Sequence, residues 1–466
     1  MNELRELELK MITSSISLLD NCKQFVLQSD LEQSIDYYNR VLKVFDSIYS
    51  NRKTEEKYNP TPVFDLLITM EEKHSKVVDK FEKGRYKELA PDLLDQIITY
   101  YEEIRKYIEL QDSHESLGMN TQNKYYKNFV EQKLLSKVSN ELLKQWKLFL
   151  PRVLQKYYDP TISIVYSRMT NEGSHKIIPQ QLFWESLVPF LNPKRTAYVY
   201  SDKNMYTHLF KDLNIRQPRI MLKSIERQLY FNDDEMVSID KAHDMLTTCE
   251  KNMVIKGSVK SDQDNFKAIE YIDKKQRIKV GQMTVYDFLD WYEGNWTLEE
   301  QVHQHKDLKT INPNKTSIVR VVTLRWKQEF HHLLSFVQIP ISESSDQNNE
   351  SNDIVVGLED NGTFRHFGFD KNGKYYTCHP DTEVGFNTLP PLENINEFIE
   401  QAKLLHTRVL HYKMVSWDFV VGEDGGPIFT EMSFGGAVWR YQLASQKPLF
   451  RGLTKEVLIE AARREK

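Results

Sequence analysis

The chain has 466 residues, too many for one hydrophobic core, so about two to four domains of roughly 100 to 200 residues each are expected. Its 40% apolar and 28% charged residues are typical of a globular protein, and its net charge of -5 argues against a general nucleic-acid binder. No stretch approaches the roughly 20 apolar residues of a membrane span, and the charged N-terminus lacks an apolar signal core. We therefore predict no nucleic-acid partner and no membrane span.

The three cysteines, Cys22, Cys249 and Cys378, lie far apart and form no CxxC pair. Neither a disulfide framework nor a zinc site is indicated by this spacing. A chain of this kind fits a reducing compartment, so we predict a cytoplasmic location.

Apolar residues recur at intervals of three and four from about Leu4 to Glu109, which predicts amphipathic helices. Turn formers interrupt the pattern at Asn51–Pro62 and Gly84–Pro91, so three or four helices packed as a bundle are expected over residues 1–115. The clearest repeat consists of Leu93, Leu94, Ile97, Ile98, Tyr101 and Ile104. These stripes are more typical of a packed core than of a cofactor site.

The polar stretch Gln111–Thr121 predicts a linker or bend, and one further helix is expected from about Tyr126 to Tyr158. Residues 116–190 are accordingly interpreted as a helical lead-in to the next domain. Beyond Ile177, turns with proline and β-branched runs become frequent, which indicates a mixed α+β domain over residues 191–466. The expected strands include Met253–Ile255, Ser317–Leu324, Leu333–Ile341 and Ile354–Leu358, the last two joined by a polar loop over Ser342–Asp353.

The segment Trp417–Ser433 contains two apolar runs joined by a Gly-Gly turn, with Asp418 and Glu431 at the same end of the two runs. This pattern predicts a hairpin, and residues at the same end of adjacent antiparallel strands lie close together. Two carboxylates so close in an apolar setting favour a hard divalent cation. We predict that they bind Mg²⁺ together with a nucleotide phosphate.

Three cations could meet such a phosphate. Lys256 ends the apolar run that begins at Met253, and Lys203 precedes a helical pattern, so both are expected at exposed ends of elements. Each lysine, taken alone, is more often a solvated surface residue than a ligand. Arg320 interrupts a β-branched run, and an arginine inside a strand usually needs an anion partner.

The segment Thr297–Val302 ends an expected strand and carries Glu299 and Glu300. Their carboxylates could accept hydrogen bonds from an adenine amino group or a ribose hydroxyl. The alternative is that they cap or solvate the helix that follows, and on local grounds this alternative is favoured.

Taken in order, the two lysines, the Glu-Glu pair, the strand arginine and the paired carboxylates resemble the ATP-grasp fold. More narrowly, residues from about Leu191 to Leu458 look like the sugar-transfer-associated ATP-grasp family. The motifs that carry this likeness are Leu191-Asn192-Pro193, Ser201-Asp202-Lys203-Asn204, Asn312-Pro313, Arg320, His379-Pro380-Asp381-Thr382, Trp417-Asp418 and Gly435-Gly436.

The resemblance implies two α+β subdomains that grip ATP, in an ATP-grasp domain over residues 191–466. It implies catalytic roles for Arg320 and Lys256. The implied nucleotide contacts are Lys203, Lys256, Glu299, Glu300, Val302 and Arg320, with Glu300 facing the adenosine. The implied Mg²⁺ ligands are Asp418, Glu431 and Ser433.

By the same resemblance, the chain is expected to be an ATP-dependent ligase that activates a carboxylic acid as an acyl phosphate and passes the acyl group to an amine or a hydroxyl. The acceptor could be carried by another molecule, and the pathway could assemble glycans, amino sugars or specialised metabolites. The helical bundle would dock a partner protein or an acceptor carrier.

The sequence also departs from the family's pattern. The stretch Gly257–Asn265, where a glycine-rich loop is usual, holds one glycine, and Ser433 stands where an asparagine is usual. Ser317 replaces a common asparagine, and Asn352-Asp353 replaces an expected Gly-Gly pair. These changes leave open a noncatalytic relative that senses nucleotide or acts as a scaffold, and a kinase that phosphorylates a small molecule without ligation.

Overall fold

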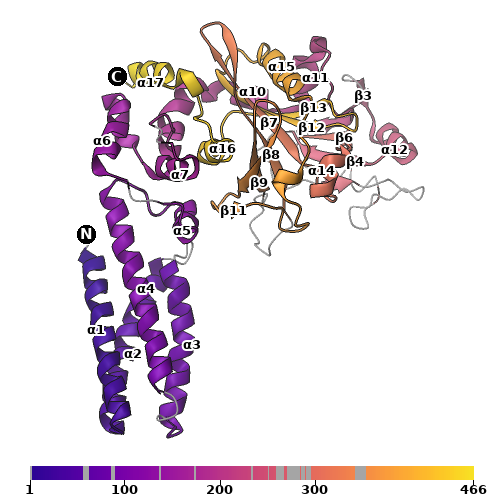
Figure 1. Cartoon of the computed structure of the whole chain (residues 1–466). Coiled ribbons are helices and arrows are strands. Elements are labelled where there is room, and N and C mark those ends of the chain that lie inside the picture. The colour runs from indigo at the N-terminus through magenta and orange to yellow at the C-terminus, as the bar shows by residue number, and fades with distance from the viewer. Residues whose placement is uncertain are drawn as a thin grey trace. The chain divides into compact units, whose positions relative to one another are not determined.

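The computed structural model describes residues 3–55, 62–85, 90–135, 138–172, 175–231, 235–249, 251–258, 267–269, 284, 289, 295–341 and 353–465. The chain forms two compact units, which Figure 1 shows. The first comprises Met1–Lys133 with Asp159–Thr161, and the second Leu134–Tyr158 with Ile162–Lys466. Among the described helices, none combines the length and the apolar character needed to cross a membrane.

The first unit is built on four long helices: α1 (Glu3–Leu27), α2 (Leu31–Glu55), α3 (Pro62–Glu82) and α4 (Ala90–Ser116), followed by the shorter α5 (Lys124–Glu131) (Figure 1). The predicted apolar spacing places one face of α4 in the core, since Leu94, Ile97, Tyr101 and Ile104 are fully buried. The predicted helical bundle is therefore confirmed, with four helices.

The predicted linker at Gln111–Thr121 is wrong in its first half, because α4 continues to Ser116. Three of its polar side chains are buried: Gln111 donates to the Thr121 hydroxyl over 3.0 Å, and His114 lies 2.7 Å from the Tyr126 hydroxyl. Internal hydrogen bonds thus replace water for residues whose composition indicates a linker.

The single helix predicted from Tyr126 to Tyr158 is also wrong. The structure has α5, α6 (Asn140–Phe149) and the 3₁₀-helix η2 (Arg152–Tyr157) in its place. Lys133 adopts a left-handed φ of 57°, which ends α5, and the Ser139 side chain caps α6 by accepting from Leu142 N over 3.2 Å. Pro151 then stops the α-helical pattern.

The second unit contains a seven-stranded, wholly antiparallel sheet with the order β11-β10-β9-β8-β7-β12-β13 (Figure 1). Its strands are β7 (Ile318–Trp326), β8 (Glu329–Pro340), β9 (Asp353–Leu358), β10 (Phe364–Phe369), β11 (Tyr375–Tyr376), β12 (Met414–Val421) and β13 (Pro427–Ser433). The strands predicted at Ser317–Leu324, Leu333–Ile341 and Ile354–Leu358 are confirmed.

Both faces of this sheet are covered. Val319, Val321 and Trp417 pack on one side in a core shared with α15 (Ile395–His406). On the other side, Val322 and Phe336 pack in a core that includes residues of α16 (Val438–Ser445) and α17 (Thr454–Arg464). The period-two alternation of β7 and β12 thus sends successive side chains into two different cores.

The remaining helical elements of the second unit are short and surround its sheets. They are α7 (Thr161–Thr170), α8 (Gln180–Leu182), the π-helix η3 (Phe183–Leu187), α9 (Val188–Leu191), η4 (Lys194–Thr196), α10 (Ala197–Ser201), η5 (Lys203–Met205), α11 (Tyr206–Leu209), η6 (Lys211–Leu213), α12 (Ile239–Thr248), α14 (Lys306–Ile311), η8 (Phe386–Thr388), α16 (Val438–Ser445), η9 (Arg451–Leu453) and α17 (Thr454–Arg464).

A second, six-stranded sheet has the order β3-β2-β1-β6-β4-β5 and is also antiparallel. Its strands are β1 (Ile220–Ile225), β2 (Gln228–Phe231), β3 (Glu235–Val237), β4 (Met253–Gly257), β5 (Lys267–Ile269) and β6 (Trp296–Glu300). Leu222, Ile255 and Leu298 pack with residues of α12 in one core. The predicted α+β class with a helical bundle before it is confirmed.

Candidate active site

Three charged residues line up across adjacent strands of the seven-stranded sheet. Asp418 on β12 is the Cα partner of both Arg320 on β7 and Glu431 on β13. Because directly opposed residues share a face of a sheet, the three side chains lie on the side opposite Val319 and Trp417. The predicted hairpin with Asp418 beside Glu431 is confirmed. We call Arg320, Asp418 and Glu431 the ion row.

Within the ion row, Arg320 is fixed by three hydrogen bonds. Its Nε and Nη2 donate to the two carboxylate oxygens of Asp418 over 2.5 and 2.6 Å, and its Nη1 donates to the Tyr441 hydroxyl over 3.0 Å. Burial disfavours the charged guanidinium, yet the Asp418 charge and these hydrogen bonds raise the pKa of Arg320 well above its ordinary value. The strand arginine therefore has the anion partner that its position predicts.

Lys203 ties the ion row to the smaller sheet. Its Nζ lies 3.7 Å from Glu431 Oε1 and 3.4 Å from the carbonyl oxygen of Gly257, at the end of β4. Its backbone N donates to the Ser258 carbonyl over 2.8 Å. Only 7% of Lys203 is exposed, so the prediction of an exposed end is wrong. The ammonium group is thus enclosed between a backbone oxygen of the smaller sheet and a carboxylate of the larger one.

Tyr206 is a buried phenol close to the carboxylates of the site. Tyr206 is buried, and its hydroxyl accepts from Met432 N over 3.4 Å. Burial, and after it the charges of Glu431, Asp418 and Asp202, raise the pKa of this phenol well above its ordinary value. Several carboxylates acting on one buried group are a favourable setting for a cation.

A second polar cluster lies on the face of the smaller sheet opposite its apolar core. Thr297 on β6 is the Cα partner of Lys223 on β1 and of Lys256 on β4. Lys256 Nζ donates to Glu299 Oε2 over 2.8 Å, and the Thr297 hydroxyl donates to Glu299 Oε1 over 3.1 Å. Lys223 is 3% exposed and donates to the Thr207 hydroxyl over 3.0 Å. Two lysines and one glutamate thus share one face.

Glu300 points to the other side of β6 from Glu299. Its carboxylate lies 2.7 Å from Lys251 Nζ and 3.6 Å from an Nη of Arg219. Neither glutamate caps the following helix α14, whose N-cap is His305, so the favoured interpretation of them as capping or solvated residues is wrong. Val302 lies just after β6, half-buried, in the connection between the two sheets.

The chain offers oxygen ligands suited to Mg²⁺ in the ion row. Glu431 and Ser433 alternate along β13, so Ser433 shares the face of the two carboxylates. The Ser433 hydroxyl oxygen is buried with no hydrogen-bond partner among the described residues. No three His, Cys, Asp or Glu side chains of the described residues cluster closely enough to hold a metal ion alone. Such a donor set fits Mg²⁺, which commonly binds one or two carboxylates and completes its shell with phosphate and water.

Two features of this site were not predicted. Lys223 interrupts the apolar run of β1, which is the signal that identified Arg320, and could have been found in the same way. Tyr441 lies on a helix distant in sequence from the residue it contacts, and no local pattern marks it.

The structure describes some of the positions at which the sequence departs from the family's pattern. Ser317 is fully buried, and its hydroxyl has no partner among the described residues. Asp353 is held by Arg440, whose Nη1 donates to Asp353 Oδ1 over 2.9 Å. Residues 259–265 and Asn352 lie outside the described residues.

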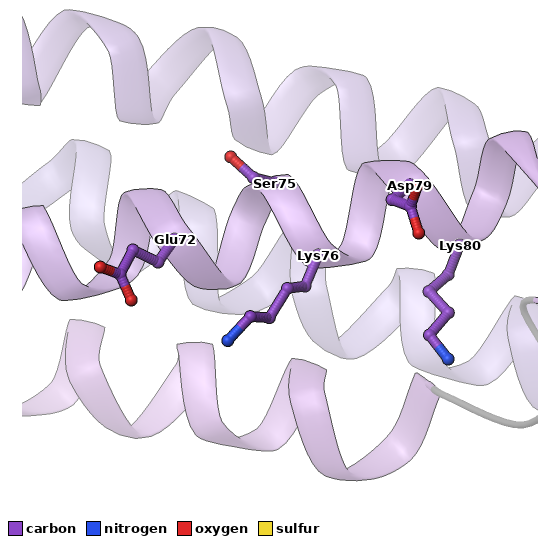
Figure 2. Close-up of a pocket in the computed structure, with 5 residues that line it drawn as sticks. All are labelled: Glu72, Ser75, Lys76, Asp79 and Lys80. Atoms are coloured by element: carbon purple, nitrogen blue, oxygen red, sulfur yellow. The ribbon is translucent and has the colours of Figure 1, made fainter.

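A shallow hollow runs along α3 in the first unit, lined by Glu72, Ser75, Lys76, Asp79 and Lys80, as Figure 2 shows. Its lining residues all come from one exposed helix face, where the charges alternate. This pattern is typical of a solvated helix surface. The hollow contributes no residue to the ion row.

The sequence profile of the family described as sugar-transfer associated ATP-grasp matches residues 182–457, which is more than half of the chain. No curated protein sequence matches. Among solved structures, the chain is similar to the ATP-grasp ligase PsnB complexed with minimal precursor, at 9% identity and a TM-score of 0.34, over 58% of this chain and 64% of that one.

The chain is also similar to the L-amino acid ligase from Bacillus licheniformis, at 11% identity and a TM-score of 0.30, over 56% of this chain and 48% of that one. A D-alanine–D-alanine ligase from Bacillus anthracis matches at 11% identity and a TM-score of 0.29, over 57% and 68% of the two chains. Because these TM-scores are low, the family assignment rests on the sequence match.

Proposed function

The chain belongs to the sugar-transfer associated ATP-grasp family, and from this premise we propose that it is an ATP-dependent ligase. It joins a carboxylic acid to an amine or a hydroxyl by way of an acyl phosphate. The acid's carboxylate attacks the γ-phosphorus of ATP, ADP leaves, and the acceptor then displaces phosphate from the acyl group. The observation that carries the proposal is the ion row, continued toward the smaller sheet by Lys203.

The cations of the site have separate roles in this proposal. Lys203 and Lys256 hold the phosphates, and Arg320 offsets the charge that develops on the transferring phosphoryl group. Catalysis of phosphoryl transfer depends mainly on positioning and on neutralising charge, and a site of fixed cations supplies both. Lys223, buried on the same face as Lys256, adds a further positive charge to the phosphate side.

The segment from Glu299 to Val302 is assigned to the adenosine, because it connects the two sheets next to Lys256. The proposal retains Glu300 as the residue facing the adenosine, although its carboxylate also meets Lys251 and Arg219. Asp418, Glu431 and Ser433 would hold Mg²⁺, whose charge offsets that of the phosphate oxygens.

The test measures nucleotide binding before turnover. The full-length chain is titrated with ADP and with the ATP analogue AMPPNP, with and without Mg²⁺, and ADP release is then assayed with panels of acids and of amine or hydroxyl acceptors. We expect both nucleotides to bind in a Mg²⁺-dependent manner, and ADP release to require an acid. Absence of nucleotide binding at millimolar concentration would refute the proposal.

A second candidate is a noncatalytic relative that binds nucleotide as a sensor or scaffold. Two observations favour it: Ser433 supplies a neutral hydroxyl in place of an amide, and both carboxylate oxygens of Asp418 are already engaged by Arg320. Such a protein binds ATP but releases no ADP with any acid. A kinase would be distinguished by a stable phosphorylated product in place of inorganic phosphate.

The acid is proposed to be a small molecule, and the acceptor a small molecule that is either free or bound to a carrier. The helical bundle of the first unit is the proposed docking element for a carrier or a partner protein. Pull-down with the bundle surface charges reversed, compared with the unchanged chain, would test that role.

A further inference from the structure

We propose that Tyr441 is a positioning residue for Arg320, held in place by its stacking on Phe336 and by the loop that passes it at Gly436. The inference rests on the proposed function, in which Arg320 binds phosphate, because it identifies Tyr441 as the group that orients this arginine. Tyr441 itself touches no reacting atom in this assignment.

The contacts of Arg320 show what Tyr441 adds. A guanidinium has five N–H donors, and Arg320 uses two of them on Asp418 and one on the Tyr441 hydroxyl. With respect to the described residues, two N–H groups therefore remain for an anion. Asp418 fixes one edge of the planar group, and Tyr441 holds Nη1 over 3.0 Å, so the plane has contacts from two directions. Arg320 is 8% exposed, and the hydroxyl contact therefore lies in a setting where water competes little.

Tyr441 is itself rigidly held. Its ring stacks on Phe336 with centroids 4.3 Å apart and an interplanar angle of 27°, and Phe336 is the Cα partner of Arg320 on the neighbouring strand. The helix that carries Tyr441 sits directly on β9, where a Cβ at Gly357 would lie 2.2 Å from the Ala444 carbonyl oxygen. The position of the hydroxyl is thus set by the stacking of the ring on Phe336 and by the close packing of its helix on β9.

Gly436 makes room for this hydroxyl. A Cβ on residue 436 would lie 2.4 Å from the Tyr441 oxygen and 2.7 and 2.8 Å from Cε2 and Cζ of its ring, and the Gly436 φ of 152° lies in the region that favours glycine. The Gly436 carbonyl accepts from Gln180 Nε2 over 3.1 Å, so the loop is fastened where it passes the hydroxyl. This loop follows directly from β13, which carries Glu431 and Ser433. The glycine thus lets the loop after the metal-binding strand pass close to the group that holds Arg320.

The test compares two nucleotides that differ by the γ-phosphate. Dissociation constants of Mg²⁺ with ADP and of Mg²⁺ with AMPPNP are measured on the full-length chain and on Tyr441→Phe, which keeps the ring and removes the hydroxyl. We expect AMPPNP to bind about tenfold more weakly to the variant, as loss of a hydrogen bond to a charged group implies, and ADP to bind within about twofold of the unchanged chain.

The matched control is Tyr166→Phe. The Tyr166 hydroxyl donates to the Gln446 carbonyl over 3.0 Å, at the C-terminal end of the helix that carries Tyr441. This variant also removes one tyrosine hydroxyl that supports the helix, but it leaves Arg320 untouched. Its ratio of AMPPNP to ADP affinity is expected to equal that of the unchanged chain.

A double-mutant comparison provides an independent measurement. Tyr441→Phe is expected to weaken AMPPNP binding in the unchanged chain, and to weaken it several-fold less in the Arg320→Ala background, where no guanidinium is left to position. Equal effects in the two backgrounds would contradict the inference.

The outcomes separate this inference from the proposed function. If the unchanged chain binds neither nucleotide, the proposed function fails and the inference fails with it. If Arg320→Ala lowers the affinity ratio but Tyr441→Phe leaves it unchanged, the proposed function stands and the inference is overturned. An equal loss of ADP and AMPPNP binding in Tyr441→Phe also overturns it, since that result reports general damage to the fold.

Discussion

At the scale of single residues, the site depends on how charges are divided among three strands. Asp418 gives both oxygens to Arg320, whereas Glu431 is 3.7 Å from Lys203 and 28% exposed at its side chain. A carboxylate that already accepts two charged N–H groups donates less electron density to a metal. We therefore expect Glu431 to be the dominant carboxylate for Mg²⁺.

The first prediction concerns Glu431→Gln. The amide has nearly the same shape but no charge, so Mg²⁺-dependent ADP release should fall by two or more orders of magnitude, roughly the effect of removing an electrostatic group from a catalytic site. ADP release under saturating Mg²⁺ is the measurement. Glu423→Gln is the control, since Glu423 lies in the turn of the same hairpin with its side chain 71% exposed, and its activity should be unchanged.

The second prediction concerns Asp418→Asn. Removing this charge leaves Arg320 buried and uncompensated, so the free energy of unfolding of the second unit should fall by about 3 to 5 kcal/mol. Denaturant unfolding measures it. Asp424→Asn is the comparison, because the Asp424 pair with Arg216 is exposed and screened by water, so its loss should change the free energy of unfolding far less. Equal losses in the two variants would contradict the assigned role of burial.

Arg320 could be predicted from sequence because a charge inside a β-branched run is a local signal of a buried partner. Lys223 carries that same signal and was not predicted. The identity of its partner could not be predicted from sequence. Asp418 contacts Arg320 because β7 pairs with β12, and these two strands lie far apart in the chain. No residue pattern within either strand specifies this register.

At the scale of elements, α16 can pack closely against β9 because Gly357 has no side chain. The third prediction is that Gly357→Ala lowers the free energy of unfolding by about 1 to 3 kcal/mol, because a Cβ would meet three backbone atoms of Ala444 and Ser445 within 2.7 Å. Thermal unfolding is the readout. Gly452→Ala has nothing within 4 Å of the new Cβ and should leave stability nearly unchanged.

The fourth prediction concerns His74 in the helical bundle. Its Nδ1 lies 2.7 Å from the Tyr38 hydroxyl, and burial lowers its pKa to about 4. The unfolded chain takes up the proton near pH 6.5, so the neutral histidine contributes stability that is fully present above about pH 6.5 and is lost as the pH falls toward 4. The expected loss is about 3 kcal/mol, since a shift of one pKa unit corresponds to about 1.4 kcal/mol.

Unfolding curves of the full-length chain at pH 7 and pH 4.5 provide the measurement. His74→Gln keeps a hydrogen-bond acceptor for Tyr38 but cannot take up a proton, so the acid-dependent loss from the bundle should be smaller by most of that amount. An unchanged dependence on pH would show that His74 is not the group responsible.

Elements whose partners lie near them in sequence could be predicted, as the hairpin that carries Asp418 and Glu431 illustrates. Elements whose ends depend on tertiary contacts could not. The last turns of α4 are polar in sequence, and they remain helical because Gln111 and His114 find partners in the segment that follows. The contact of Tyr441 with Arg320 likewise depends on how a helix is laid across a sheet.

At the scale of the whole molecule, all residues assigned to nucleotide binding belong to the second unit, Leu134–Tyr158 with Ile162–Lys466. The fifth prediction is that calorimetry of the full-length chain shows two unfolding transitions, and that Mg²⁺ with ADP raises the temperature of one of them. At a free nucleotide concentration about 100 times the dissociation constant, the stabilisation should be about 2.7 kcal/mol. The transition altered in His74→Gln should be the one that nucleotide leaves unchanged.

The general plan of the molecule, a helical bundle followed by an α+β domain, could be predicted because apolar periodicity changes along the chain. The substrates could not, since the surfaces that would recognise an acid and an acceptor are formed by loops without a general residue code.

The position of Lys203 has one further consequence. Its ammonium group touches a backbone oxygen of the six-stranded sheet and a carboxylate of the seven-stranded sheet, so the protein's own atoms already link the two sheets. Part of the entropy lost in bringing these sheets together is therefore lost during folding. An incoming anion needs to take over one existing contact of Lys203, and its affinity is not reduced by having to immobilise two independent halves.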